Sequence, residues 1–177
     1  DTERAFLTGY SDTNLKKKTT PSHVQYFKNQ GYFTQAMHPG YAWFYDRKNV
    51  DTFIGFESLK FYEDSYKDID EETLKSGLYF GMLADTDFFD SIISEFEKAV
   101  DEDKKYFNFS VTYQNHGPYD AVNFSPTNYA VKKDGYTDEG YAIFNNYLSG
   151  IKKTDLALKE LRDYVDGSKE PIVLILF

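Results

Sequence analysis

The chain has 177 residues, of which 29 are acidic and 20 are basic, and its net charge is −9. This acidity argues against binding to a nucleic-acid backbone, which needs clustered cations. The absence of cysteine excludes disulfides, thiolate zinc sites and cysteine nucleophiles. No apolar run reaches the ~18 residues that would span a membrane, and 16 tyrosines with 16 phenylalanines suit half-buried surfaces and polar ligand grooves.

The first part of the chain predicts alternating helices and strands. A short helix is expected over residues 2–7, and a polar loop over 11–20. A second helix, capped by Thr20 and ended by Gly31, follows the usual capping preferences. A strand is expected over 32–37. A further short strand is expected over 52–56, followed by an acidic, tyrosine-rich surface excursion over 57–75.

The second part continues the alternation. Residues 85–100 and 137–165 have the apolar spacing of helices, whereas 106–113 alternates as a strand does. The final run, 172–177, is apolar throughout and is expected to be a buried strand, so both ends of the chain are interpreted as cuts in a longer protein. The predicted fold is α/β, with a mostly parallel sheet flanked by helices.

Ligand sites in open α/β folds gather beyond the carboxyl ends of strands. His38 follows the first predicted strand, and the loop after it leads through Trp43, Phe44 and Tyr45 to Arg47. Arginine offers a planar, permanently charged fork that fits phosphate or carboxylate, and the aromatic rings could wall a pocket. The alternative is an aromatic loop packed on the domain, with Arg47 in a surface ion pair.

A second candidate is His116, which lies between Asn115 and Gly117 in the turn leaving the strand predicted over 106–113. This histidine either meets a ligand or is simply a hydrogen-bonded turn residue. His23, near the start of a helix, is interpreted as structural. No glycine-rich phosphate loop and no pair of histidines at metal-ligand spacing occurs, so the chain alone reveals no complete active site.

These candidate residues also carry a family resemblance. The stretch Gly31 to His38 (GYFTQAMH), with Tyr41, Phe44 to Arg47 and Gly55-Phe56, resembles the middle of a lipoteichoic-acid-synthase catalytic domain, as does Val111 to Tyr119 (VTYQNHGPY). The opening DTERAFLTG is similar to the stretch after the family's nucleophilic Thr. The closing Pro171 to Phe177 is similar to the strand before its Gly-Asp-His metal motif. The resemblance places the chain in the phosphoglycerol-transferase branch of the sulfatase/alkaline-phosphatase superfamily.

The resemblance implies which residues act. A single Mn²⁺ or Mg²⁺ would be held by a Glu, the nucleophilic Thr and an Asp-His pair, all outside residues 1–177, so neither a catalytic nor a metal-binding residue is expected within them. Substrate-side residues would be His38, Arg47 and His116, which contact phosphate or glycerol, and Tyr45, which stands where the family often has Trp. Gly40 replaces a residue that is acidic in some lipoteichoic acid synthases, which leaves the acceptor open.

The expected parent protein transfers glycerol phosphate from a phosphatidylglycerol-type lipid to a glycerol-phosphate polymer or glycolipid, on the extracellular face of a bacterial membrane. Residues 1–177 would be a partial sulfatase-like catalytic domain, truncated at both ends, inactive alone and prone to self-association through exposed strand edges. Two alternatives remain. One is another superfamily activity, such as a phosphoethanolamine transferase, phosphodiesterase or sulfatase. The other is a non-catalytic module that binds a surface polymer.

Overall fold

The computed structural model describes residues 2–9, 21–65, 78–79, 82–121 and 128–177. The loop predicted over 11–20 and the last part of the excursion predicted over 57–75 lie outside these ranges. The chain divides into two compact units. The first unit comprises Asp1–Glu71 and Ser94–Val111, and the second comprises Glu72–Ile93 and Thr112–Phe177.

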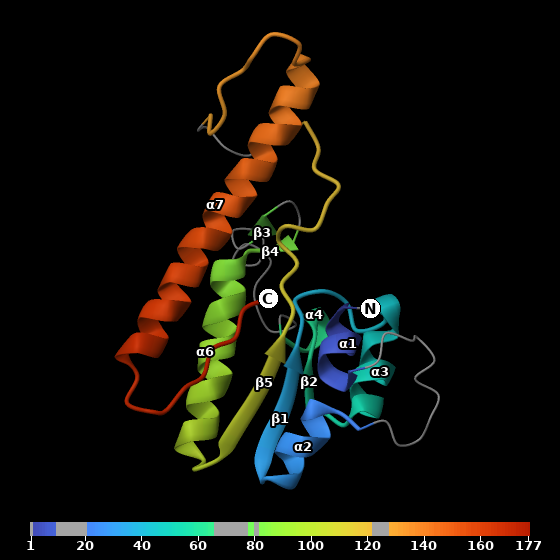
Figure 1. Cartoon of the computed structure of the whole chain (residues 1–177), viewed down its shortest axis with the longest axis vertical. Helices are drawn as coiled ribbons and strands as arrows, with labels where there is room; N and C mark the ends of the chain where they lie inside the picture. Colours follow the sequence, from blue (N-terminus) through green and yellow to red (C-terminus); the bar gives the residue numbers. More distant parts are fainter. Residues whose placement is uncertain (1, 10–20, 66–77, 80–81, 122–127) are drawn as a thin grey trace. The chain divides into compact units, whose positions relative to one another are not determined.

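The first unit is built on a three-stranded parallel sheet, ordered β2-β1-β5 (Figure 1). Its strands are β1 (Tyr32–Met37), β2 (Ser58–Lys60) and β5 (Lys105–Ser110). Met37, the last residue of β1, pairs with the last residue of each neighbour, Lys60 and Ser110. The prediction of a parallel α/β sheet is therefore confirmed, and the three strands end at a common edge.

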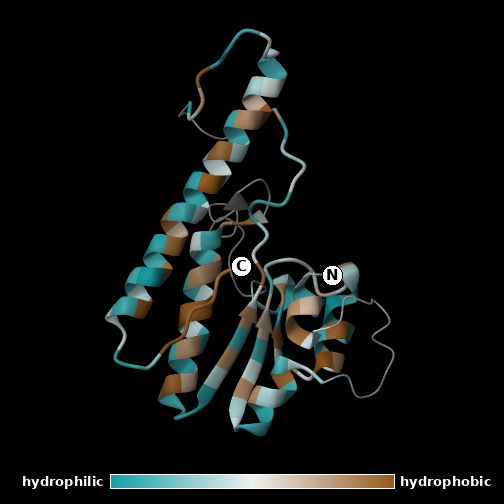
Figure 2. Ribbon diagram, in the orientation of Figure 1, coloured by the Kyte–Doolittle hydropathy of each residue, from teal (hydrophilic) through white to brown (hydrophobic). Residues whose placement is uncertain are grey.

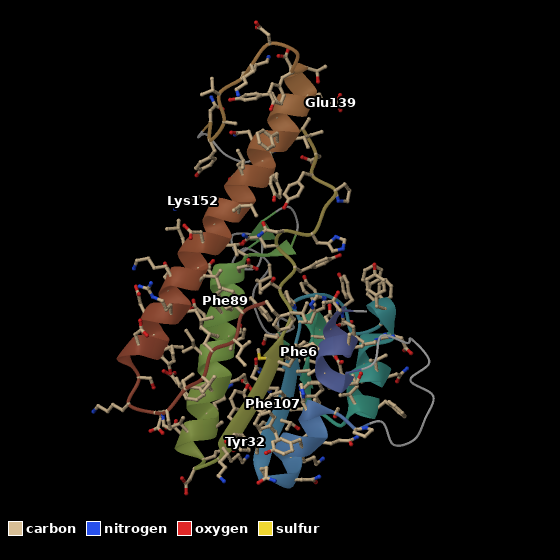
Figure 3. All side chains as sticks on the ribbon, viewed as in Figure 1. Phe6, Tyr32, Phe89, Phe107, Glu139 and Lys152 are labelled. Atoms are coloured by element: carbon tan, nitrogen blue, oxygen red, sulfur yellow. The ribbon has the colours of Figure 1, made fainter. Side chains whose placement is uncertain are left out.

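Helices α1 (Thr2–Thr8), α2 (His23–Asn29) and α3 (Arg47–Ile54) lie together beside this sheet (Figure 1). Each contributes an apolar side chain to one core with β1 and β5. The buried members of this core are Leu7, Val24, Ala36, Ile54, Phe56 and Phe109. Phe6 and Phe107, labelled in Figure 3, are partly buried against it. Burial of such side chains is the main favourable term holding the sheet and helices together.

The start of α2 differs from the predicted start by about two residues. The cap is Ser22, not Thr20: its side chain accepts a hydrogen bond from the backbone N–H of Gln25 and donates one to the carbonyl of Ile54. This hydroxyl therefore satisfies the first turn of α2 and ties it to the end of α3.

The strand expected over 52–56 is wrong, because these residues end α3. Val50 and Ile54 are four residues apart, so a helix turns both toward the core, where Ile54 is 2% exposed. Gly55 then adopts a left-handed conformation (φ 116°) that stops the helix. The strand follows slightly later, as β2. Tertiary packing, rather than local strand propensity, decided the outcome.

The far side of β1 carries a polar network with α6 (Asp85–Asp101), whose residues from Ser94 onward belong to the first unit. Glu95 accepts hydrogen bonds from Lys60 (2.7 Å), Lys98 (2.6 Å) and Gln35 (3.0 Å). Gln35 in turn accepts a hydrogen bond from the hydroxyl of Tyr106. Since side chains alternate along a strand, Gln35 points away from the core that holds Ala36.

The second unit contains α7 (Asp138–Gly167) and a two-stranded antiparallel pair, β3 (Leu78–Tyr79) and β4 (Met82–Leu83). Thr137 caps α7 by accepting a hydrogen bond from the N–H of Gly140, as its predicted start requires. Apolar and polar residues alternate along α7 (Figure 2). Within the described ranges, neither α7 nor any shorter helix combines the length and apolarity needed to cross a membrane.

The strand expected over 172–177 is also wrong. This segment forms no strand in the structure, and Val173, Ile175 and Phe177 are 86%, 64% and 71% exposed. A strand persists only where a neighbour takes up its backbone hydrogen bonds. In the described sheet β1 pairs with β2 and β5 only. The apolar composition of 172–177 was therefore not sufficient to make this segment a strand.

Candidate functional site

His38 is fixed at the common edge where the parallel strands end. Its backbone N–H donates to the carbonyl of Lys60 (2.9 Å), and Val111 donates to the carbonyl of Met37 (3.0 Å). Its ring Nδ1 lies 2.9 Å from the carbonyl oxygen of Val111. The side chain is only 6% exposed. Backbone groups from both neighbouring strands therefore set the position of this histidine.

The contact with Val111 also decides the tautomer of His38. A carbonyl oxygen only accepts, so Nδ1 carries the proton and donates. The opposite nitrogen, Nε2, is then an acceptor in the neutral ring and a donor in the protonated ring. Nε2 lies so close to Gly40 that a Cβ at that position would stand 2.6 Å from it. Glycine at position 40 therefore leaves room for the imidazole in this orientation.

Arg47, the first residue of α3, is held by Glu3 of α1. The two terminal nitrogens of Arg47 donate to the two carboxylate oxygens of Glu3, at 2.6 and 3.1 Å. This is the two-pronged geometry that makes arginine–carboxylate pairs strong. The Nε atom of Arg47 is buried and has no partner among the described residues. The ion pair foreseen as the alternative for Arg47 is thus present, and it fixes the guanidinium.

Glu3 links Arg47 to His38. Burial by itself would raise the pKa of Glu3, but the hydrogen bonds and the charge of Arg47 outweigh burial and hold the pKa below its ordinary value. The charge of His38 lowers it further. Arg47 and a protonated His38 therefore both favour the ionised form of the Glu3 carboxyl group, although 44 residues separate Glu3 from Arg47.

A second acidic residue, Asp51, stands one helical turn after Arg47. Burial raises the pKa of Asp51 to about 6. The charges of Arg47 and Arg4 lower it, whereas the charge of Glu3 raises it. Two carboxylates thus share the neighbourhood of Arg47, one stabilised as an anion and one favouring its protonated form.

We expect the contribution of Asp51 to the free energy of unfolding to decrease as pH rises from about 4 to 6, because the folded state holds a proton on Asp51 that the unfolded state releases earlier. Asp51→Asn should remove this loss and stabilise the protein at pH 7 by about 1–2 kcal/mol, less than the shift implies because a buried amide must also be desolvated. Thermal unfolding of both proteins from pH 4 to 7 measures the difference in their stability. A stability difference that stayed constant across this range would contradict a raised pKa for Asp51.

The loop between His38 and α3 has an unusual backbone. It ends in a single 3₁₀ turn, Phe44–Asp46, in which Tyr45 and Asp46 have φ values of 56° and 55°. A left-handed conformation costs about 1–2 kcal/mol for a non-glycine residue. Arg4 donates to the carbonyl of Tyr45 (3.4 Å), and Asn49 donates to Asp46 (2.7 Å). The Tyr45 ring is 65% exposed.

His116 belongs to the second unit and is exposed. Its Nδ1 lies 2.6 Å from the carbonyl of Gly117, and its ring meets that of Tyr113 edge-on at 5.1 Å. As at His38, a carbonyl fixes the proton on Nδ1, so Nε2 is an acceptor when the ring is neutral. The convergence of His116 with His38 and Arg47 stays a prediction.

The two residues before His116 are anchored by one hydroxyl. The Oγ1 of Thr154 on α7 accepts hydrogen bonds from Gln114 (2.9 Å) and Asn115 (2.7 Å) and donates one to Asp85 (2.6 Å). Gln114 also accepts from the N–H of Asp85 (2.9 Å). Burial raises the pKa of Asp85. The loop carrying His116 is therefore held by residues from α6 and α7.

Sequence reasoning named His38, Arg47 and His116 as candidates. It missed Glu3, which holds Arg47, and Thr154, which anchors the two residues before His116. Nothing in the sequence links them to the site, because each contact joins positions about 40 residues apart. The described ranges contain no group of three His, Cys, Asp or Glu side chains that could hold a metal ion. The described residues alone therefore do not fit a Mn²⁺ or Mg²⁺ site.

A profile of the Sulfatase family matches residues 1–177, and the chain belongs to this family. Two curated proteins show related sequences. A protein named for cyclic β-1,2-glucan modification in Rhizobium meliloti (strain 1021) is 27% identical over 97% of this chain and 26% of its own length. The lipoteichoic acid synthase of Staphylococcus saprophyticus is 27% identical over 75% of the chain and 18% of its length. The chain spans about a quarter or less of these relatives.

Three solved structures have a fold similar to that of this chain. The lipoteichoic acid synthase LtaP of Listeria monocytogenes has a TM-score of 0.74 at 16% identity, covering 94% of this chain and 39% of that one. An alkaline-phosphatase-superfamily protein of Vibrio parahaemolyticus gives 0.65 at 21%, covering 94% and 38%. The Streptococcus pyogenes phosphoglycerol transferase GacH, in complex with sn-glycerol-1-phosphate, gives 0.55 at 21%, covering 91% and 44%. The expected sulfatase family and the expected α/β fold are confirmed.

Proposed function

We propose that residues 1–177 form the substrate side of a phosphoglycerol transferase of the sulfatase family. In this proposal His38, Arg47 and His116 contact the phosphoryl oxygens of a phosphatidylglycerol-type lipid, and Tyr45 lies against its glycerol. The acceptor is a glycerol-phosphate polymer or a glycolipid at the outer face of a bacterial membrane. The nucleophilic Thr and the ligands for Mn²⁺ or Mg²⁺ come from parts of the parent protein outside these residues.

The arrangement of Arg47, Glu3 and His38 supports this proposal most directly. Phosphoryl transfer gathers negative charge on the phosphoryl oxygens, and fixed donors aimed at them stabilise the transition state. Arg47 uses one hydrogen on each terminal nitrogen for Glu3, and the second hydrogen on each nitrogen points elsewhere. Glu3 thus holds the guanidinium in place before substrate arrives, which reduces the ordering needed during the reaction.

A second candidate differs only in the acceptor. The relative named for cyclic β-1,2-glucan modification matches 97% of this chain, a larger share than the lipoteichoic acid synthase matches. A glucan would then receive the glycerol phosphate. The donor chemistry and the roles of His38, Arg47 and His116 are the same in both versions.

The decisive experiment compares the full-length parent protein with residues 1–177. Both are incubated with Mn²⁺ and a phosphatidylglycerol analogue, and release of glycerol phosphate is measured. We expect turnover by the full-length protein and none by the shorter chain, because the nucleophile lies outside it. Comparable turnover by residues 1–177 would contradict this division of roles. A full-length protein that cleaves only sulfate esters or phosphoethanolamine lipids would contradict the substrate assignment.

A further inference from the structure

Three residues of the second unit close a ring of hydrogen bonds that includes the chain just before His116. The backbone N–H of Asp85, at the start of α6, donates to Oε1 of Gln114 (2.9 Å). Nε2 of Gln114 donates to Oγ1 of Thr154 on α7 (2.9 Å), and that hydroxyl donates to Oδ2 of Asp85 (2.6 Å). We call Asp85, Gln114 and Thr154 the anchoring ring. Like His116, all three belong to the second unit.

The direction of each hydrogen bond in the anchoring ring is determined. A backbone N–H only donates and a backbone carbonyl only accepts. The side-chain amide of Gln114 meets the N–H of Asp85 at one end and the carbonyl of Gly150 (3.2 Å) at the other, so its oxygen and nitrogen cannot be exchanged. The nitrogen therefore donates to Thr154. The hydroxyl of Thr154 directs its one hydrogen to Asp85, which leaves it able to accept from Nδ2 of Asn115 (2.7 Å) as well.

Asp85 occupies a position that is unfavourable for a carboxylate. The residue is 1% exposed, and its Oδ1 atom has no hydrogen-bond partner among the described residues. A buried polar atom without a partner costs stability, and proteins depart from such packing rules mainly at functional sites. The other carboxylate oxygen, Oδ2, is the one that orients the hydroxyl of Thr154. The cost of burying Asp85 therefore indicates a role in holding Thr154 rather than in stability alone.

The anchoring ring is coupled to His116 through the turn itself. The side chains of the two residues before His116 both donate to the hydroxyl of Thr154. The carbonyl of Asn115 accepts from the hydroxyl of Tyr119 (3.1 Å), and the N–H of His116 donates to the carbonyl of Tyr113 (2.9 Å). These contacts hold the turn on both sides of the histidine, so the position of the His116 imidazole depends on Thr154.

We propose that Asp85 and Thr154 are positioning residues for His116, which fix its turn so that the imidazole is in place before substrate arrives. The contact of His116 with the substrate rests on the proposed function. The ordering of the turn does not, because it uses only contacts within the second unit. Displacing a reacting group by about 1 Å can slow a reaction by about 10²-fold. Loss of the Thr154 hydroxyl should therefore reduce the rate although threonine itself does not touch the substrate.

The first test measures the order of the turn without any substrate. Thr154→Val in the full-length protein removes the hydroxyl and keeps the shape of the side chain, while Gln114 retains its contact with Gly150. We expect hydrogen exchange of the backbone amides of residues 113–119, measured by mass spectrometry, to become about tenfold faster, because the turn opens more readily. Thr154→Ser restores the hydroxyl and should return exchange to its original rate. Unchanged exchange in Thr154→Val would overturn the proposal.

The second test asks whether this order matters for the reaction. Release of glycerol phosphate from a phosphatidylglycerol analogue with Mn²⁺ is measured for full-length His116→Ala, Thr154→Val and the double variant. We expect Thr154→Val to lower kcat by about 10–10²-fold and to cause no further loss when His116 is already alanine, because it acts through His116. An equal loss in both backgrounds would overturn the proposal. Full activity of His116→Ala would instead contradict the proposed function, and the exchange experiment would still decide whether Thr154 orders the turn.

Asp85 is tested by the same two measurements. Asp85→Asn keeps an oxygen that can accept from Thr154, whereas Asp85→Ala does not. Asp85→Ala should therefore show the faster exchange and the lower kcat, and Asp85→Asn should recover part of both. Identical behaviour of the two variants would overturn the role of Asp85. Thr52→Val is the matched control, because the Thr52 hydroxyl donates to the carbonyl of Lys48 (2.7 Å) on α3, in the first unit. It should change neither the exchange of residues 113–119 nor kcat.

Discussion

Arg47→Ala should lower the proposed transfer of glycerol phosphate by the full-length protein by about 10²–10³-fold, the range seen when one donor to a developing negative charge is removed. Arg47 is the only described arginine held in place by a two-pronged carboxylate contact, so its donors are already oriented. Arg47→Lys should recover only part of the loss, because an ammonium keeps the charge but not the fork. Initial rates at saturating lipid measure both effects.

Two controls separate chemistry from folding in this experiment. Arg162→Ala removes an exposed arginine of α7 that pairs only with nearby carboxylates, Asp163 and Asp166, and it should leave the rate unchanged. Arg47→Ala also leaves Glu3 without its partner, so thermal unfolding is measured for each variant. A folded Arg47→Ala protein with a rate close to that of the unaltered enzyme would contradict the assigned role.

Glu95→Gln should destabilise the protein by about 2–3 kcal/mol at neutral pH. Burial would raise the pKa of Glu95, but hydrogen bonds from Lys60, Lys98 and Gln35 outweigh burial and lower the pKa to about 2. One pKa unit corresponds to about 1.4 kcal/mol. Because Lys98 is largely exposed, solvent screening makes the stabilisation smaller than the whole pKa shift of Glu95 implies. Denaturant unfolding at several pH values measures the difference.

The stabilisation by Glu95 should depend on pH. A carboxyl group whose folded pKa is lowered contributes its full stability above its ordinary value of 4.5 and loses it as pH falls toward 2. The difference between the two proteins should therefore shrink steadily below pH 4.5. Glu102→Gln, which alters an exposed pair with Lys104, should have little effect at any pH. A difference for Glu95→Gln that stayed constant down to pH 2 would contradict the explanation.

The fold was predictable where local pattern and tertiary packing agree. The first strand was predicted residue for residue, because a glycine-terminated helix precedes it and its β-branched and aromatic residues suit a sheet. The predictions failed over 52–56 and 172–177, where apolar composition fits either a strand or another state. At the first position burial of Val50 and Ile54 favours a helix, and at the second no described strand supplies a partner.

The sequence allowed His38, Arg47 and His116 to be proposed as site residues, but it did not predict the side-chain contacts that hold Arg47 and the loop before His116. His38 could be identified because it follows a strand, and parallel strands bring their carboxyl ends to one edge. The contact of Arg47 with Glu3 could not, since a salt bridge across 44 positions leaves no local pattern. Thr154 was missed for the same reason: a threonine in the middle of an amphipathic helix is read as a solvent-facing residue.

The six residues of β1 also act as a spacer of fixed length. Side chains alternate along a strand, so inserting or deleting one residue in β1 would turn His38 to the opposite face and shift its ring away from the carbonyl of Val111. The neighbouring strands could not compensate, because both end level with Met37. A change in the length of this strand is therefore expected to displace His38, whereas a change in a loop leaves the strand register intact.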